Sequence, residues 1–356
     1  MAANTADRGE RNYRVYISTA GDGTITTLKM VSASDEPQRL QTILIAGGNS
    51  SGGLSTPMAV SPDQRRLYAA VRNAPLPITS FAIDPADGSL SVLGTARLPA
   101  STPYVATDRS GRFLFSVANI GATLAVSAID NQGRVERYAC QVLHIGHKLH
   151  CIVVDARNAH VYVSSTDDCA IHQFDLDATM GRLVPCDTPI VTLNAGGDPR
   201  HMVFSPDGRF LYVTTEAGGR VACFSVDAAS GCLAELPDIA MMPGDFTGRP
   251  STADIHLTHD GRFLYASERV LNTIVVYSVD QSTGALSRIE TVDTEGVPRA
   301  FAIAPDDSFM LVAGQDTGNI SAYAIDHDTG KLAKGVQFEI GPQPNWIEFI
   351  DLGAEQ

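Results

Sequence analysis

The sequence lacks most of the features that mark membrane proteins and secreted proteins. It contains a single Trp among 356 residues, and no segment approaches the roughly 18 consecutive apolar residues that a membrane-spanning helix requires. The opening segment MAANTADRGERNYR has no apolar core of the kind found in a secretory signal. We therefore predict a cytoplasmic protein that has no membrane partner.

Paired cysteine motifs are also missing. None of the six cysteines belongs to a CxxC or zinc-ribbon pattern, and a cytoplasmic chain of this size keeps its thiols reduced. We expect all six to be ordinary buried thiols. They are Cys140, Cys151, Cys169, Cys186, Cys223 and Cys232.

Positive charge is scarce as well. The chain has 26 Lys and Arg against 40 Asp and Glu, which gives a formal net charge of −14. A nucleic acid or an anionic membrane needs a basic surface that neutralises its phosphates, so we predict neither as a partner. The hydrophobic fraction of 44% supports a substantial core, and the length suits one large all-β domain or two ordinary domains.

What the chain does contain is an internal repeat. A strand, a turn and a second strand recur as SPDQRRLYAAVRN, TDRSGRFLFSVAN, DARNAHVYVSSTD, SPDGRFLYVTTEA, THDGRFLYASERV and APDDSFMLVAGQD. Each copy is followed by an alternating strand and an acidic turn, as in RVACFSVDAASGCL. A period of roughly 45 to 53 residues with four strands is typical of a propeller blade.

The two ends of the chain supply a seventh blade. RVYISTAGDGTITTLKM resembles a second and a third strand, QRLQTILIA a fourth, and PNWIEFIDL near the C-terminus a first. Joining them closes the ring and removes exposed sheet edges. We predict an all-β, seven-bladed β-propeller of four-stranded antiparallel blades, as a single domain over residues 13–352. Residues 1–12 are polar and are predicted to form a flexible tail.

Two positions of the repeat differ between blades, although positions that only maintain the fold should be alike. The start of the innermost strand is occupied by Thr56, Pro103, His150, Arg200, Ala253, Arg299 and Asn345. The end of the second strand is occupied by Ala20, Arg72, Asn119, Thr166, Glu216, Arg269 and Gln315. In antiparallel strands these two positions lie side by side, so both rings should surround one mouth of the central channel.

The polar members of these rings predict a site for a small anion. Four of them are arginines, whose planar guanidinium groups donate paired hydrogen bonds to carboxylate or phosphate. His201, Asp254 and His256 follow along the innermost strands, and Trp346 either caps the channel or packs between blades. Any one of these residues can instead be a solvated group or part of an ion pair between blades. For Asp254 and His256 the favoured interpretation is hydrogen bonding to neighbouring blades. We interpret three aspartates as structural turn residues, namely Asp207, Asp260 and Asp306.

The same rings argue against a metal and against any other cofactor. A divalent cation prefers several carboxylate or amide oxygens. The rings offer Glu216, Asn119 and Asn345 among four arginines, which is a poor set of ligands for a cation. We predict that no metal is bound.

The runs GDPRHMVFSPDGRFLYV, ADIHLTHDGRFLYASER, MMPGDF and VPRAF resemble the bacterial seven-bladed 6-phosphogluconolactonases. These share a superfamily with fungal carboxymuconate lactonizing enzymes, and the resemblance extends from Tyr13 to Leu352. It implies a catalytic set of His150, Arg200, Glu216 and Arg269. The segment HIGHKLH departs from the short turn of the phosphogluconolactonase branch, so a phosphosugar lactone and a dicarboxylic aldarolactone both stay open as substrates.

We predict a hydrolase that opens a small anionic sugar lactone by metal-free attack of water. Glu216 or His150 is the base, Arg200 and Arg269 hold the anion and the oxyanion, and further contacts come from a larger set. That set is Arg72, Asn119, His201, Asp254, His256, Arg299, Gln315 and Trp346. The alternatives are an aldarolactone hydrolase, a carboxymuconate-type cycloisomerase and a protein-binding scaffold. No Ser, Cys or Thr nucleophile is indicated at the mouth, and we expect a monomer or a weak homodimer.

Overall fold

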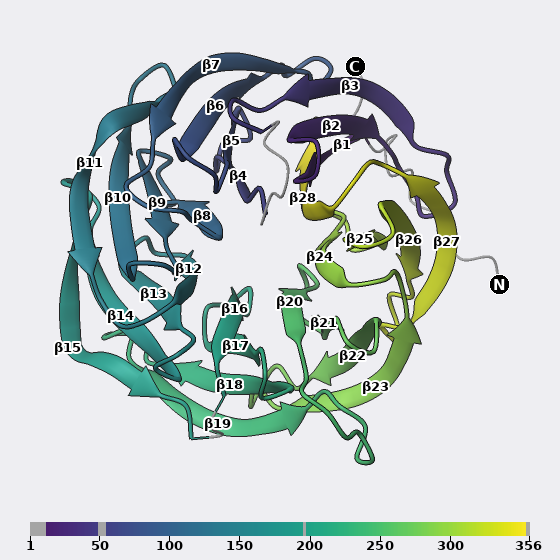
Figure 1. Ribbon diagram of the computed structural model, residues 1–356. Coiled ribbons are helices and arrows are strands. Elements are labelled where there is room, and N and C mark those ends of the chain that lie inside the picture. Colours follow the sequence, from purple (N-terminus) through teal and green to yellow (C-terminus); the bar gives the residue numbers. More distant parts are fainter. Residues whose placement is uncertain (1–11, 49–54, 195–196, 354–356) are drawn as a thin grey trace.

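The computed structural model describes residues 12–48, 55–194 and 197–353. These residues form 28 strands in seven four-stranded sheets, which stand around a central channel (Figure 1). Neighbouring strands within the sheets are antiparallel. The described residues contain no helix of the length and apolarity needed to cross a membrane. The predicted all-β, seven-bladed propeller is therefore confirmed.

In each blade the strands run in order from the channel to the outside (Figure 1). The first blade contains β4 (Met58–Val60), β5 (Arg66–Ala70), β6 (Pro77–Ile83) and β7 (Leu90–Arg97). The second contains β8 (Tyr104–Thr107), β9 (Phe113–Val117), β10 (Thr123–Ile129) and β11 (Val135–His144). The third contains β12 (Leu149–Val154), β13 (His160–Ser165), β14 (Ala170–Asp177) and β15 (Arg182–Thr192).

The fourth blade contains β16 (Pro199–Phe204), β17 (Phe210–Thr215), β18 (Arg220–Val226) and β19 (Leu233–Ala240). The fifth contains β20 (Thr252–Leu257), β21 (Phe263–Glu268), β22 (Thr273–Val279) and β23 (Leu286–Asp293). The sixth contains β24 (Pro298–Ile303), β25 (Phe309–Gly314), β26 (Asn319–Ile325) and β27 (Leu332–Glu339). The seventh contains β28 (Pro344–Asp351), β1 (Tyr13–Thr19), β2 (Thr24–Lys29) and β3 (Gln38–Leu44).

The seventh blade joins the two ends of the chain, as predicted. Its innermost strand β28 pairs antiparallel with β1, and Tyr13 lies opposite Asp351. Asn12 is buried, and its carbonyl accepts a hydrogen bond from the Leu352 amide at 3.2 Å. The remainder of the predicted flexible tail, residues 1–11, lies outside the described residues.

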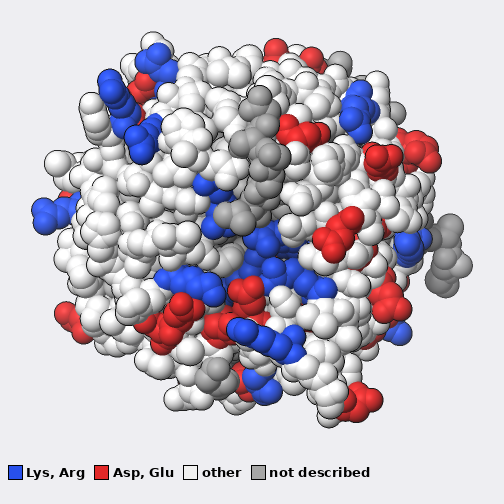
Figure 2. Space-filling model, viewed as in Figure 1, with Lys and Arg blue, Asp and Glu red and all other residues white. Residues whose placement is uncertain are grey.

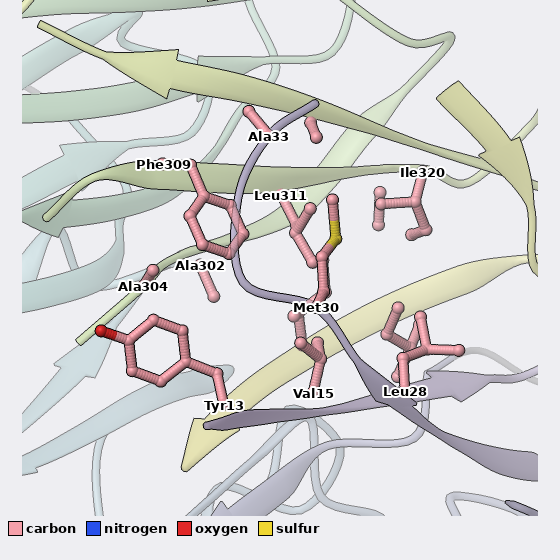
Figure 3. Packing of buried hydrophobic residues seen from close by; sticks show 14 of the residues in the cluster. Tyr13, Val15, Leu28, Met30, Ala33, Ala302, Ala304, Phe309, Leu311 and Ile320 are labelled. Atoms are coloured by element: carbon pink, nitrogen blue, oxygen red, sulfur yellow. The ribbon is translucent and has the colours of Figure 1, made fainter. Parts of the chain in front are cut away.

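The core is divided among the interfaces between neighbouring blades, and each of the seven interfaces has its own apolar cluster. Figure 3 shows the cluster between the sixth and seventh blades, where Val15 and Leu28 of the N-terminal strands meet Phe309, Leu311 and Ile320. The second strands, such as β1 and β17, are buried along their whole length, because every blade packs against two others. This arrangement fixes the positions of the inner strands around the channel.

Tyrosines of the second strands connect neighbouring blades. The Tyr212 hydroxyl donates to the carbonyl of Gly284 at 3.1 Å, and Tyr16, Tyr162 and Tyr265 make the equivalent bond to the next blade. Gly284 has a φ of +76°, and a Cβ there would lie 2.4 Å from the Phe210 ring. The acidic turn therefore ends in glycine for two reasons, its left-handed backbone and the ring that packs on it.

The turn aspartates are structural, as predicted. Asp207 accepts hydrogen bonds from the Ser205 hydroxyl at 2.7 Å and from the Arg209 amide at 3.1 Å. Asp260 and Asp306 do the same in their own turns.

All six cysteines are free, but the prediction that all of them are buried is wrong. Only Cys151 and Cys223 are buried. Cys140 and Cys186 lie on the outermost strands β11 and β15, where one face of the strand meets solvent. Cys169 and Cys232 lie next to turns.

Candidate active site

The two polar rings lie at one mouth of the channel, as predicted from the internal repeat. His150, Arg200 and Arg299 lie near the start of β12, β16 and β24, while Glu216 and Arg269 directly follow β17 and β21. Backbone hydrogen bonds hold the two rings together, including the Glu216 amide to the Asp198 carbonyl at 2.9 Å. Figure 2 shows Lys and Arg side chains gathered at the centre of this face, with acidic side chains beside them.

A bulge at the start of several innermost strands enlarges the polar set. The pairing register shifts between Pro199 and Met202 in β16, and between Thr252 and Ile255 in β20. Two residues of the bulged strand then oppose one residue of its partner, which redirects side chains. Consecutive residues such as Arg200 and His201 can therefore both face the channel.

Glu216 lies between two arginines. Its Oε1 accepts a hydrogen bond from Arg269, and its Oε2 lies 3.9 Å from Arg200 Nε. The Arg200 side chain is only 2% exposed, and its Nη1 donates to the Ala253 carbonyl at 2.5 Å. Arg269 also donates to the Ser251 carbonyl at 3.1 Å. The carboxylate is thus fixed between side chains from two neighbouring blades.

The charges at the mouth perturb one another. Burial raises the pKa of Glu216, but Arg200 and Arg269 outweigh it, so the pKa lies below the usual value and the group is ionised at neutral pH. Burial and the neighbouring Arg269 and Arg72 lower the pKa of Arg299 to about 10. The described residues give Arg299 neither an ion pair nor a hydrogen bond. A small anion is the natural counter-charge for such a group.

His150 is buried beside these cations. Its side chain is among the buried polar groups, and no described group lies within hydrogen-bonding distance of its Nδ1. Burial and the positive charge of Arg200 hold the pKa of His150 well below its usual range, so the imidazole is neutral at pH 7. A neutral ring with an unused polar atom in the channel is able to bind a water or a substrate oxygen.

The other predicted mouth residues lie around this centre. Arg72 Nε lies 3.5 Å from the Ser101 hydroxyl, and Asn345 accepts a hydrogen bond from the Thr56 amide at 2.9 Å, which connects the seventh blade to the first. Asn119 and Gln315 follow the second strands of the second and sixth blades, and both are half-buried. Asn119 Oδ1 has no hydrogen-bond partner among the described residues.

Trp346 contacts aromatic side chains of other blades across the channel, and it also packs against the apolar cluster between the seventh and first blades. Its ring centroid is 5.2 Å from that of Tyr104 and 6.1 Å from that of His201. His201 in turn lies 5.2 Å from both Tyr104 and His150. These four side chains come from four blades and form a continuous series of ring contacts across the channel. We call them the aromatic partition.

Asp254 and His256 lie below the arginines, on the far side of this partition. Asp254 binds His201 Nδ1 at 2.7 Å and His256 Nε2 at 3.3 Å, and it accepts a hydrogen bond from the Phe301 amide at 3.1 Å. Asp254 therefore links three blades, which confirms the expected hydrogen bonding to neighbouring blades for this residue. His256 pairs with Asp254 on its own strand β20, and the described residues give it no hydrogen bond to a neighbouring blade. Burial and Arg200 lower the pKa of His201 to about 4, although Asp254 opposes this shift, so His201 is also neutral.

Two residues at the channel were not singled out in the sequence. Tyr104 is the fourth member of the aromatic partition. The comparison between blades singled out polar residues, and an aromatic residue at the start of a strand did not stand out in it. Lys148 lowers the pKa of Glu216 and lies two residues before His150. In the structure Val297 and Gln343 occupy the same repeat position as Lys148 and share its positive φ of 53° to 56°, a backbone feature that the sequence does not reveal. Such backbone is often found at functional sites.

The described residues contain no group of three His, Cys, Asp or Glu side chains arranged to hold a metal ion. The arrangement at the mouth instead combines fixed cations, one carboxylate clamped between two of them and a neutral buried imidazole. This set can bind an anion, oppose a developing oxyanion and accept a proton from water.

Comparison with known proteins identifies the class. The model of the family described as lactonase, 7-bladed beta-propeller, matches residues 14–349. The chain belongs to this family, and it is a lactone hydrolase.

Named relatives agree over most of the chain. It is 35% identical over 298 residues to the 6-phosphogluconolactonase of Serratia proteamaculans, covering 84% of this chain and 89% of the relative. It is 33% identical to the 6-phosphogluconolactonase of Yersinia pestis over 94% of this chain and 96% of the relative. A solved structure of a putative 6-phosphogluconolactonase from Bacteroides uniformis has a TM-score of 0.85 at 26% identity, covering 96% of this chain and all of that one.

Proposed function

We propose that this protein hydrolyses the lactone of a phosphorylated sugar acid, of the 6-phosphogluconolactone type, by direct attack of water at the channel mouth without a metal ion. The observation that carries the proposal is the set of four arginines at the mouth, of which Arg299 has no partner among the described residues, beside the neutral, buried His150. The names of the relatives support the phosphorylated substrate.

Arg299 and Arg72 bind the phosphate in this proposal, and Arg200 and Arg269 face the lactone carbonyl. The guanidinium group suits both tasks, because it delivers two parallel hydrogen bonds to a planar or tetrahedral anion. Arg200 is fixed by the Ala253 carbonyl and Arg269 by the Ser251 carbonyl. Fixed donors oppose oxyanion charge without having to reorganise during the reaction.

His150 is the base in this proposal, and Glu216 orients the arginines. Both carboxylate oxygens of Glu216 face arginines, whereas Nδ1 of His150 is unused. His150 takes a proton from the attacking water as the C–O bond forms. The tetrahedral intermediate then collapses, the ring C–O bond breaks, and the imidazolium returns the proton to the departing sugar oxygen. The product is the open-chain acid, and the enzyme is regenerated.

The first experiment is a turnover panel of 6-phosphogluconolactone, gluconolactone, an aldarolactone and a carboxymuconate. We expect kcat/KM to be highest for the phosphorylated lactone and unchanged after exhaustive chelation. Preference for the aldarolactone or turnover of the muconate would contradict the substrate assignment. Loss of activity with EDTA that calcium or zinc restores would contradict the metal-free mechanism.

The second experiment separates the two candidate bases. His150→Gln should lower kcat by about 100- to 10,000-fold, the usual contribution of general-base catalysis. Glu216→Gln keeps the shape of the side chain and should lower kcat/KM less than His150→Gln does. Thr166→Ala is the matched control, because Thr166 holds the position of Glu216 one blade earlier, and it should change kcat little. A larger loss of kcat in Glu216→Gln than in His150→Gln would make Glu216 the base.

The cytoplasmic location, the monomeric or weakly dimeric state and the lack of nucleic-acid and membrane partners stay predictions. They follow from composition and charge, and the proposed reaction does not depend on them.

A further inference from the structure

Below the aromatic partition lies a cavity of about 420 Å³ that the proposed reaction does not use. Its lining includes Gln64, His259 and Pro305, which lie in turns between innermost and second strands. Those turns are at the ends of the innermost strands opposite to the mouth. The cavity therefore extends toward the other face of the propeller, and its volume is within the range of roughly 300–1,000 Å³ that small-molecule sites occupy.

The repeat singles out two residues of this cavity. The third position after the start of each innermost strand is apolar in five blades and polar in two. The seven residues are Ala59, Ala106, Val153, Val203, His256, Ala302 and Glu348. Maintenance of the fold requires only a small apolar side chain at this position, as five blades demonstrate. His256 and Glu348 therefore need another explanation.

Glu348 has an oxygen available to a ligand. Its Oε1 accepts a hydrogen bond from the Trp346 indole at 2.8 Å, and within the described part of the chain no hydrogen bond to Oε2 is found. Aromatic side chains form much of the surrounding wall, namely Trp346, Phe301 and Tyr104. A carboxylate oxygen beside aromatic faces is the combination that binds ammonium groups, through an ion pair and cation–π contacts.

The cavity lacks the arginines that characterise the mouth. The described residues that line it include no Lys or Arg. Asp254 compensates His256 at 3.3 Å and holds His201 at 2.7 Å, while Asp307 compensates His259 at 2.7 Å. Among the described residues Glu348 forms no ion pair within 4 Å, although the nearby His256 favours its ionised form. An anionic sugar lactone is therefore disfavoured here.

We propose that this lower cavity is a second binding site, for a small organic cation that carries an aromatic ring, such as an arylalkylamine. The ammonium group pairs with the Glu348 carboxylate, and the ring lies against Trp346 and Phe301. None of the four arginines of the mouth lines this cavity. The inference does not rest on the proposed function, because the roles proposed above for lactone hydrolysis involve no residue of the lower cavity. His201, Asp254, His256 and Trp346, which the sequence predicted as substrate contacts, line this cavity instead.

The protonation of Glu348 gives the site a defined pH dependence. Burial raises the pKa of Glu348 to about 7. The titratable groups that face it are His256 and Asp254 from β20, His201 from β16, His259 from the turn after β20 and Tyr104 from β8. Only the carboxylate form pairs with an ammonium group, so cation affinity should rise by about 10-fold between pH 6 and pH 8, as the ionised fraction does.

The test uses the fluorescence of Trp346, the single Trp of the chain, which lines the cavity. Three probes of nearly equal shape differ in charge: phenethylamine, 2-phenylethanol and phenylacetate. We expect saturable changes with phenethylamine, at least 10-fold weaker binding of 2-phenylethanol, and no binding of phenylacetate in this cavity. Equal affinity for the amine and the alcohol would overturn the proposal.

Two variants probe the contacts. Glu348→Gln should weaken phenethylamine binding about 10-fold and remove its pH dependence, and Glu339→Gln, an exposed acid on β27, should change neither. If Glu348→Gln fails to fold, Ala302→Leu keeps the carboxylate and fills the cavity, and it should abolish the fluorescence change. Arg299→Gln at the mouth should leave amine binding unchanged. Unaltered amine binding in both Glu348→Gln and Ala302→Leu would disprove the site.

Discussion

Replacing Glu216 by Gln removes the carboxylate that two arginines of the mouth contact directly. Glu216 Oε2 lies 3.9 Å from Arg200 Nε, and Arg269 donates to Oε1. Two unit charges about 4 Å apart interact by about 4 kcal/mol at the effective dielectric constant of a protein surface region. The carboxylate side chain is 25% exposed, so solvent screens part of this energy, and its own burial is costly. We expect Glu216→Gln to lower the free energy of unfolding by about 2 kcal/mol at pH 7.

Thermal unfolding in the presence of phosphate is the sharper assay for the same variant. For a chain of this size, about 2 kcal/mol corresponds to a decrease in Tm of about 3 °C. The variant mouth carries one more uncompensated positive charge, so phosphate should bind it more tightly and raise its Tm more than that of the wild type. Thr166→Ala is the control. It loses the hydroxyl bond to the Lys148 carbonyl at 2.6 Å, and its response to phosphate should match that of the wild type.

The pH dependence of this difference follows from the pKa of Glu216. The folded-state pKa is lowered, so the stabilisation is complete above the unfolded-state pKa of about 4.3 and is lost as the pH falls below it. The difference in stability between wild type and Glu216→Gln should therefore decrease below about pH 4. An unchanged Tm at pH 7 together with an identical response to phosphate would refute the role of Glu216 as the counter-charge of the arginines.

Three further predictions concern other parts of the molecule. Arg269→Lys should lower kcat/KM on the best lactone by at least 10-fold, because an ammonium group cannot contact Glu216 and the Ser251 carbonyl with the same geometry. Wild-type turnover by this variant would contradict the role of the guanidinium group. Asp254→Asn should destabilise the protein by about 2–3 kcal/mol at pH 7. Because the pKa of Asp254 is strongly lowered in the folded state, this difference in stability should shrink as the pH falls below about 4. Denaturant unfolding at pH 7 and pH 3.5 measures the difference. Tyr212→Phe should lower the free energy of unfolding by about 1 kcal/mol, because the hydrogen bond to the Gly284 carbonyl is lost. Gly284→Ala should lower it more, because the added Cβ would lie 2.4 Å from the Phe210 ring. Equal urea midpoints for these two variants would be evidence against the close contact.

The fold could be predicted from the sequence because its information is repeated. Six copies of one turn and one acidic hairpin fix the strand order, and the two terminal fragments are the pieces that a seventh copy lacks. The rings of the mouth could be predicted for the same reason. Arg200 and Glu216 occupy positions that are polar in some blades and apolar in others, and only function or a contact across the channel explains that difference.

Features that depend on distances across the channel could not be predicted. The Tyr104 and Trp346 rings meet at 5.2 Å although 242 residues separate them (346 − 104), and no local pattern carries such a contact. The bulges that bring Arg200 and His201 to the same side of β16 were hidden too, because strict alternation predicts opposite faces. The exposure of Cys140 was missed because the spacing of the cysteines does not show which of them lie on the solvent face of an outermost strand.

The shared seventh blade also determines when the molecule can become complete. Strand β1 is made first, but its inner partner β28 is made last, so one edge of the N-terminal sheet stays unpaired during nearly the whole of synthesis. At about 5–20 residues per second, that interval is roughly 15 to 70 s. A chain that stops before Pro344 would have six full blades but would lack Asn345, Trp346 and Glu348, and with them one segment of the mouth, the partition and the lower cavity. The ring thus closes only when β28 is in place, because neither half of the channel is finished until this strand has been added.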